Sequence, residues 1–120
     1  MKLYGIPNCN TVKKSRTWLE SHGISYQFHD FKKDGVNAAM LGQWLEQTTW
    51  EKLVNRAGMT WRNLSDTEKA QVHDNDSAIA LMLAKPSVIK RPVLVNDARI
   101  LQLGFDAEKY ETLLIESSKK

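Results

Sequence analysis

The spacing of apolar and polar residues predicts a β-α-β unit at the start of the chain. An apolar block at residues 2–6, stopped by Pro7, is typical of a short buried strand. Apolar positions then recur at helical spacing over residues 10–22, which predicts a helix ended by Gly23. Residues 24–29 alternate between apolar and polar, which indicates a second strand. A helical crossover of this kind makes the two strands parallel neighbours.

The middle of the chain has the pattern of several short helices. Asn37 is a helix cap before an apolar-periodic stretch, and residues 50–54 form an amphipathic turn or two. Ser65 opens a segment with capping-box spacing, and a strongly apolar helix at residues 78–83 is halted by Pro86. Three tryptophans occupy helical apolar positions and are predicted to lie in the core: Trp18, Trp44 and Trp50.

The last third of the chain predicts a β-hairpin and a terminal helix. Residues 93–95 and 100–101 are strand-like, and the turn signal Asn96-Asp97 separates them. Asp106 is the expected cap of the final helix.

The order β-α-β, helical segment, β-β-α is the thioredoxin arrangement with helices inserted in its middle. We therefore predict an α/β fold with a thioredoxin-like mixed sheet flanked by helices. The helical insertion is expected at about residues 36–86 of a single domain spanning residues 1–116, and residues 117–120 are expected to form a polar C-terminal tail.

Composition narrows the class of protein. With 120 residues, 42% of them hydrophobic, the chain can bury a core. Its formal charge is +3 and its lysine pairs are scattered, which favours a solvated surface over a nucleic-acid interface. No apolar run suits a signal peptide or a membrane span, so we expect a cytoplasmic protein. One cysteine excludes an internal disulfide.

That cysteine, Cys9, stands where the first strand meets the first helix. Unpaired amides of a first helical turn favour a thiolate and lower the pKa of a thiol, so this place suits a reactive cysteine. The alternative is a buried, inert cysteine that acts as a small hydrophobe. The three histidines share no metal-ligand spacing with each other or with Cys9, so no metal site is expected. We expect His29 to have a structural role rather than to act as a base near the site.

A second informative segment runs from Ile89 to Val93 and contains Arg91-Pro92. Only an X-Pro bond turns cis at modest cost, and in thioredoxin-like folds a cis-proline at this point faces the active cysteine. We therefore predict a cis Arg91-Pro92 bond, with Arg91 carried toward Cys9. The alternative is an edge-strand proline beside a solvated arginine.

Together these segments resemble the arsenate reductase (ArsC)/Spx family, and within it the YffB-like branch. The resemblance covers the chain from Met1 to about Leu114 and rests on the order and spacing of these pieces: Tyr4-Gly5-Ile6, residues 8–14, Trp18-Leu19, Phe28-His29-Asp30, Thr60-Trp61-Arg62, residues 89–92 and Leu103-Gly104-Phe105. It implies a thioredoxin-like fold, a nucleophilic cysteine, and arginines that hold an oxyanion or a carboxylate-bearing thiol.

Carried over by residue, the resemblance makes Cys9 the nucleophile and Arg56 and Arg91 the catalytic arginines. The substrate or glutathione contacts it implies are Asn8, Asn10, Thr11, Lys13, Arg56, Arg91 and Pro92. Leu103 stands at the expected place of the third arginine of arsenate reductases, and Arg99 comes earlier in that strand. Val12 stands where Spx proteins have the second cysteine of a C-x-x-C motif.

The function implied is glutathione-dependent thiol reduction with a single nucleophilic cysteine. No cofactor is expected to be bound, and glutathione or another low-molecular-weight thiol is the expected co-substrate, since Cys9 has no resolving partner in the chain. Two alternatives stay open: an arsenate reductase, disfavoured by Leu103, and a non-catalytic Spx-like regulator that binds RNA polymerase.

Overall fold

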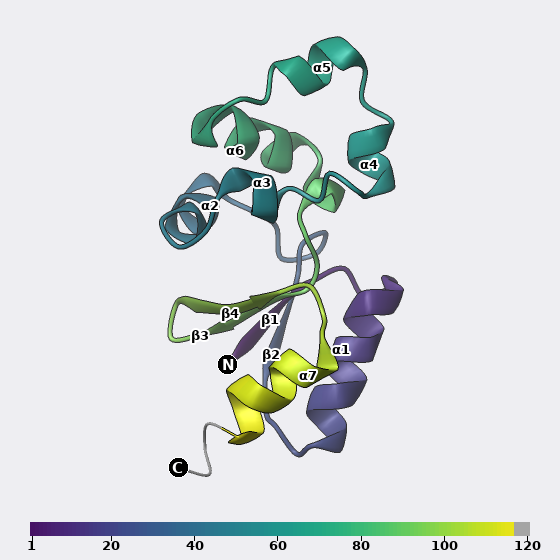
Figure 1. Ribbon diagram of the computed structural model, residues 1–120, viewed down its shortest axis with the longest axis vertical. Helices are drawn as coiled ribbons and strands as arrows, with labels where there is room; N and C mark the ends of the chain where they lie inside the picture. Colours follow the sequence, from purple (N-terminus) through teal and green to yellow (C-terminus); the bar gives the residue numbers. More distant parts are fainter. Residues whose placement is uncertain (117–120) are drawn as a thin grey trace. The chain divides into compact units, whose positions relative to one another are not determined.

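The computed structural model describes residues 1–116, which form two compact units (Figure 1). The first unit combines residues 1–30 with the chain from Arg91 onward, and the second comprises Phe31–Lys90. The polar tail predicted at residues 117–120 lies outside the described residues.

The first unit is built on a mixed four-stranded sheet in the order β2-β1-β3-β4, and the predicted fold class is confirmed. Its strands are β1 (Lys2–Gly5), β2 (Gln27–Asp30), β3 (Val93–Asn96) and β4 (Arg99–Leu103). β1 pairs with β2 in parallel and with β3 antiparallel, and β3 and β4 form the hairpin.

Helices from the two ends of the chain pack together on this sheet. They are α1 (Asn10–Ser21), α7 (Ala107–Tyr110), which Asp106 caps as predicted, and η2 (Glu111–Glu116). Tyr110 is fully buried with Leu3, Leu19 and Leu94, and its ring meets Trp18 edge-on at 5.4 Å. This core sets α1, and therefore its first residues, against the sheet.

Two boundaries in the first unit differ from the predictions. The second strand begins at Gln27 and not at residue 24: Gln27 pairs with Lys2, and Ile24 donates to the carbonyl of Leu19 at the end of α1. Residues 24–26 alternate in polarity but have no partner position in β1. The hairpin turn is Asp97-Ala98, one residue later than predicted, and both residues have positive φ, as a type I′ hairpin turn requires.

The second unit is helical. It contains α2 (Ala38–Leu45), α3 (Trp50–Leu53), α4 (Met59–Arg62), α5 (Asp66–Ala70), α6 (Asn75–Ala84) and the short 3-10 turn η1 (Pro86–Val88). Asn37 accepts from the amide of Met40, and Ser65 forms a full capping box, both as predicted. Its core is apolar and includes Leu41, Trp44, Leu53, Met82 and Ile89.

The tryptophan prediction is correct for Trp44, which is 2% exposed; Trp18 is half-buried but packs against the core of the first unit, and Trp50 is half-buried. Trp18 lies near the end of α1, and the ring of His22 stacks on its ring with the centres 3.9 Å apart. Trp50 is the first residue of the four-residue helix α3, and its ring lies beside the guanidinium of Arg56. Within residues 1–116, no helix has the length and apolar character needed to cross a bilayer.

Candidate active site

Cys9 is the residue that caps the N-terminus of α1. Its backbone is extended, with φ −89° and ψ 127°, and its carbonyl accepts the first helical hydrogen bond, from the amide of Lys13 at 2.9 Å. Its own amide donates to the carbonyl of Ile6 at 3.2 Å, which closes the loop after β1. The thiol is half-exposed. It therefore sits at the positive end of a helix and can be reached from solvent.

Gly5 lets the first turn of α1 approach β1 closely. A Cβ atom at Gly5 would lie 2.8 Å from Cγ2 of Val12, whose side chain is fully buried. Val12 is β-branched and stiff, so it cannot turn aside cheaply. The lack of a side chain at Gly5, just before the cysteine loop, therefore lets the start of α1 lie close to β1.

The surroundings of Cys9 favour its thiolate. Partial burial raises the pKa of the thiol, but the backbone amide of Val12, the guanidinium of Arg91 and the amide of Thr11 outweigh it, and the pKa is lowered below its ordinary value.

Arg91 reaches Cys9 because of how β3 is paired. Val93 pairs with Tyr4 of β1, so the residues just before β3 lie beside the end of β1, where the cysteine loop begins. The Arg91-Pro92 bond is cis, as predicted. The carbonyl of the buried Pro92 accepts a hydrogen bond from the amide of Gly104 at 2.9 Å, which joins this segment to the residue after β4. In the sequence Gly104 stands out only as part of Leu103-Gly104-Phe105 and has no predicted place at the site; it follows β4 with φ +79°, a conformation that favours glycine.

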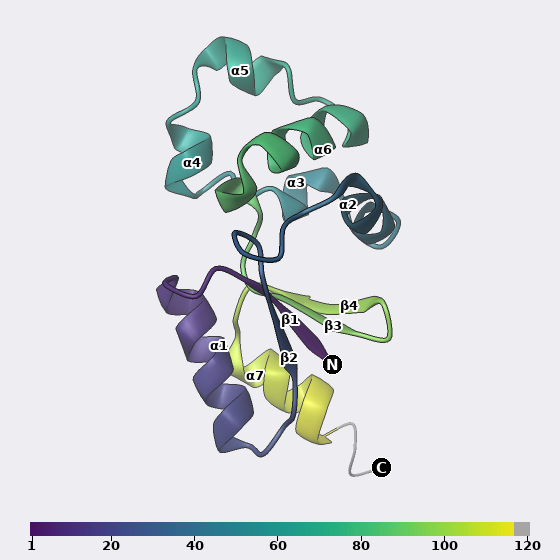
Figure 2. The same cartoon turned by 180° about the vertical axis from the view of Figure 1, so that it is seen from behind.

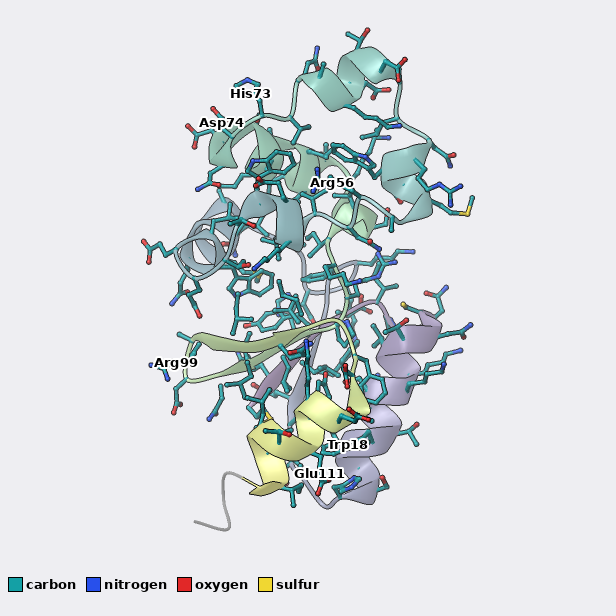
Figure 3. All side chains as sticks on the ribbon, viewed as in Figure 1. Trp18, Arg56, His73, Asp74, Arg99 and Glu111 are labelled. Atoms are coloured by element: carbon teal, nitrogen blue, oxygen red, sulfur yellow. The ribbon has the colours of Figure 1, made fainter. Side chains whose placement is uncertain are left out.

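The remaining predicted contacts divide between the two units. Asn8, Asn10, Thr11 and Lys13 are exposed on the loop and first turn around Cys9, and their substrate roles stay predictions. Arg56 belongs to the second unit, where it is exposed and its guanidinium lies 5.8 Å from the centre of the Trp50 ring (Figure 3). Its part in a site with Cys9 stays a prediction.

Arg99 does not take the place of the third arginine. It pairs with Asn96 beside the hairpin turn, and Figure 3 shows it at that tip. Leu103 is at the other end of β4 and pairs with Val93, next to Pro92. At the Pro92 end of the hairpin, β4 therefore presents an apolar side chain.

His29 has a structural environment. It pairs with Tyr4 across β1 and β2, with ring centres 4.8 Å apart. Among the described residues, no group of three or more histidine, cysteine or acidic side chains could hold a metal ion. Beside Cys9 the structure places the Arg91 guanidinium, which favours the thiolate.

Comparison with known proteins identifies the family of the chain. Residues 4–113 match the model of the ArsC family, and the chain belongs to that family. Among solved structures it is similar to the YFFB protein, with 45% identity, a TM-score of 0.87 and coverage of 94% of this chain and 97% of that one. It is also similar to an arsenate reductase (ArsC) related protein from Brucella melitensis, with 48% identity, a TM-score of 0.77 and coverage of 95% and 93%.

Curated relatives include proteins of two descriptions. An uncharacterized protein of Haemophilus influenzae is 38% identical over 109 residues, covering 91% of this chain and 94% of its own length. The global transcriptional regulator Spx of Lactiplantibacillus plantarum is 24% identical over 118 residues, covering 93% and 84%. The family therefore includes relatives described as reductase-related and relatives described as regulators.

Proposed function

We propose that this protein is a glutathione-dependent thiol reductase that uses Cys9 as its single nucleophile. The observation that carries the proposal is the position of Cys9 at the start of α1, where the helix amides and the Arg91 guanidinium lower the pKa of its thiol. Lowering the pKa toward ambient pH increases the thiolate fraction that attacks a disulfide.

The proposed cycle has two exchange steps. The Cys9 thiolate attacks the glutathione sulfur of a mixed disulfide, the old S–S bond breaks, and the released substrate thiolate takes a proton from solvent. The thiolate of a second glutathione then attacks the Cys9–glutathione disulfide, which forms oxidised glutathione and restores the Cys9 thiolate. One glutathione is consumed for each mixed disulfide reduced, so the cycle needs no bound cofactor and no second cysteine in the chain.

In this cycle Arg91 and Arg56 bind carboxylates of glutathione through charge-assisted hydrogen bonds. The exposed polar groups near Cys9 supply further contacts, and they are Asn8, Asn10, Thr11 and Lys13. Pro92 forms the wall beside the sulfur. Such a reductase works where glutathione is kept reduced, so we propose a cytoplasmic location.

Two other functions known among the relatives fit this chain less well. Arsenate reduction would lose one charge-assisted contact to the oxyanion at Leu103, a loss on the order of 1.5–3 kcal/mol. Regulation through RNA polymerase is favoured by the similarity to Spx, but Val12 stands in place of the second cysteine of a redox switch. A pull-down with RNA polymerase tests that second candidate.

Turnover of a glutathione mixed disulfide tests the proposal. Reduction of a glutathionylated peptide would be followed through oxidised glutathione for the wild type, Cys9→Ser, Arg91→Gln and Arg99→Gln, with arsenate as a parallel substrate. We expect no turnover in Cys9→Ser, reduced turnover in Arg91→Gln and unchanged turnover in Arg99→Gln, because Arg99 lies at the far tip of the hairpin. Equal turnover in Cys9→Ser, or arsenate reduced faster than the mixed disulfide, would overturn it.

A further inference from the structure

An open cavity of about 370 Å³ lies between α1 and β2 in the first unit, away from Cys9. The chain passes from the end of α1 through a short loop into β2, and Figure 2 shows this connection. The volume of the cavity is within the range of small-molecule sites. The cavity is lined by Arg16, Glu20, Ile24, Ser25, Tyr26 and Phe28.

Arg16 is held in this cavity in one orientation. Its Nε donates to the hydroxyl of Tyr26 at 3.0 Å, and its guanidinium carbon lies 4.2 Å from the centre of the Phe28 ring. These contacts occupy Nε and one face of the guanidinium. Within the described residues the two Nη groups have no hydrogen-bond partner, so an end-on pair of donors remains for a carboxylate.

Glu20 places a negative charge in the same cavity without neutralising Arg16. The two residues are one turn apart on α1, a spacing at which opposite charges often pair. No ion pair joins them in the described part of the chain, since Arg16 is turned toward Tyr26 and Phe28 instead. The cavity therefore presents separated positive and negative groups beside an aromatic wall.

We propose that this cavity binds a small zwitterion with an apolar side chain, that is, an α-amino acid. The carboxylate takes the Nη donors of Arg16, the ammonium group takes the carboxylate of Glu20, and the side chain lies against Ile24 and Tyr26. Glu20 repels multiply charged anions such as phosphate. Binding here is independent of the Cys9 chemistry, because neither Cys9 nor Arg91 lines the cavity.

The competing explanation is that Arg16 only covers the Phe28 ring. Titration of the ¹⁵N-labelled wild type with L-phenylalanine, phenylacetate and phenethylamine separates the two, because the last two probes each carry only one of the charges. We expect saturable shifts at the Arg16 Nε–H and at the amides of residues 24–28 with L-phenylalanine. Each single-charge analogue should bind about tenfold more weakly.

Variants complete the test. Arg16→Lys should weaken L-phenylalanine binding, and Glu20→Gln should reduce it to the level of phenylacetate. Arg99→Lys, the matched control, should leave it unchanged, since Arg99 is exposed at the hairpin tip. The absence of saturable shifts in the wild type at millimolar probe, equal affinity for phenylacetate and L-phenylalanine, or unchanged binding in both Arg16→Lys and Glu20→Gln would overturn the proposal. Each spectrum also reports whether the variant is folded.

Discussion

The hydrogen bond between Ser15 and Tyr110 joins the helix that carries Cys9 to the C-terminal helix. The two hydroxyl oxygens are 2.7 Å apart, and both side chains are fully buried. The residues are 95 positions apart in the sequence, so the bond adds a long-range polar link to the apolar contacts between α1 and α7. We predict that Tyr110→Phe, which removes one hydroxyl with almost no change in shape, destabilises the protein.

The expected loss of stability comes from the buried hydroxyl that the substitution leaves without a partner. Without the Tyr110 hydroxyl, Ser15 keeps a buried polar group without its partner, which costs about 1–3 kcal/mol. Ser15→Ala should cost a similar amount because it strands the Tyr110 hydroxyl. The double variant leaves neither group stranded, so it should cost less than the sum of the two, with a coupling of about 0.5–3 kcal/mol.

Urea unfolding of the four proteins measures the cycle, and a fall of about 3–6 °C in Tm per kcal/mol should accompany it. Tyr26→Phe is the matched control: the Tyr26 hydroxyl is half-exposed and water can replace its bond to Arg16, so the change should stay within about 0.5 kcal/mol. A cost for Tyr110→Phe no larger than that of the control, or strictly additive costs in the double variant, would refute the reasoning.

Three further predictions concern pH, Cys9 and the helix start. Burial raises the pKa of Tyr110 to about 12, against about 10 in an unfolded chain; its contribution to the free energy of unfolding, on the order of 2–3 kcal/mol, should therefore be complete below pH 10 and be lost as the pH rises toward 12. Arg91→Gln should raise the pKa of Cys9, measured as the midpoint of the alkylation rate against pH. Gly5→Ala should cost on the order of 1–3 kcal/mol in urea unfolding, because the new Cβ would overlap Val12.

Each of these has a result that would contradict it. The alkaline loss of stability should be smaller in Tyr110→Phe, and an identical pH profile in that variant would remove Tyr110 as the cause. For Cys9, the contrary finding is an alkylation midpoint in Arg91→Gln at or below that of the wild type. For Gly5→Ala, it is unchanged stability in urea unfolding.

Local signals predicted most of the elements because they act within a few residues. The caps at Asn37, Ser65 and Asp106 all form, since each side chain bonds to an amide two or three positions on. The start of β2 was misplaced because residues 24–26 have the right alternation, whereas a strand also needs partner positions in β1. The local pattern of residues does not indicate which distant segments pair.

The candidate site was likewise predictable only in part. The place of Cys9 followed from its local context, but the approach of Arg91 depends on β3 pairing with β1 across most of the chain, and only the proline and the family resemblance indicated it. The cavity at Arg16 was not predicted. It depends on which neighbour the guanidinium contacts: the i,i+4 spacing favours an ion pair with Glu20, whereas in the structure Arg16 donates to Tyr26.

The rate at which Cys9 forms a mixed disulfide with oxidised glutathione tests the central claim most directly. Mass spectrometry would follow the addition of one glutathionyl group at slightly acidic pH, for the folded protein and for the same chain unfolded in urea. The unfolded chain has the same thiol without the helix amides and Arg91. We predict that the folded protein reacts faster and that reduced glutathione removes the adduct. A folded protein that reacts no faster than the unfolded chain would contradict the account.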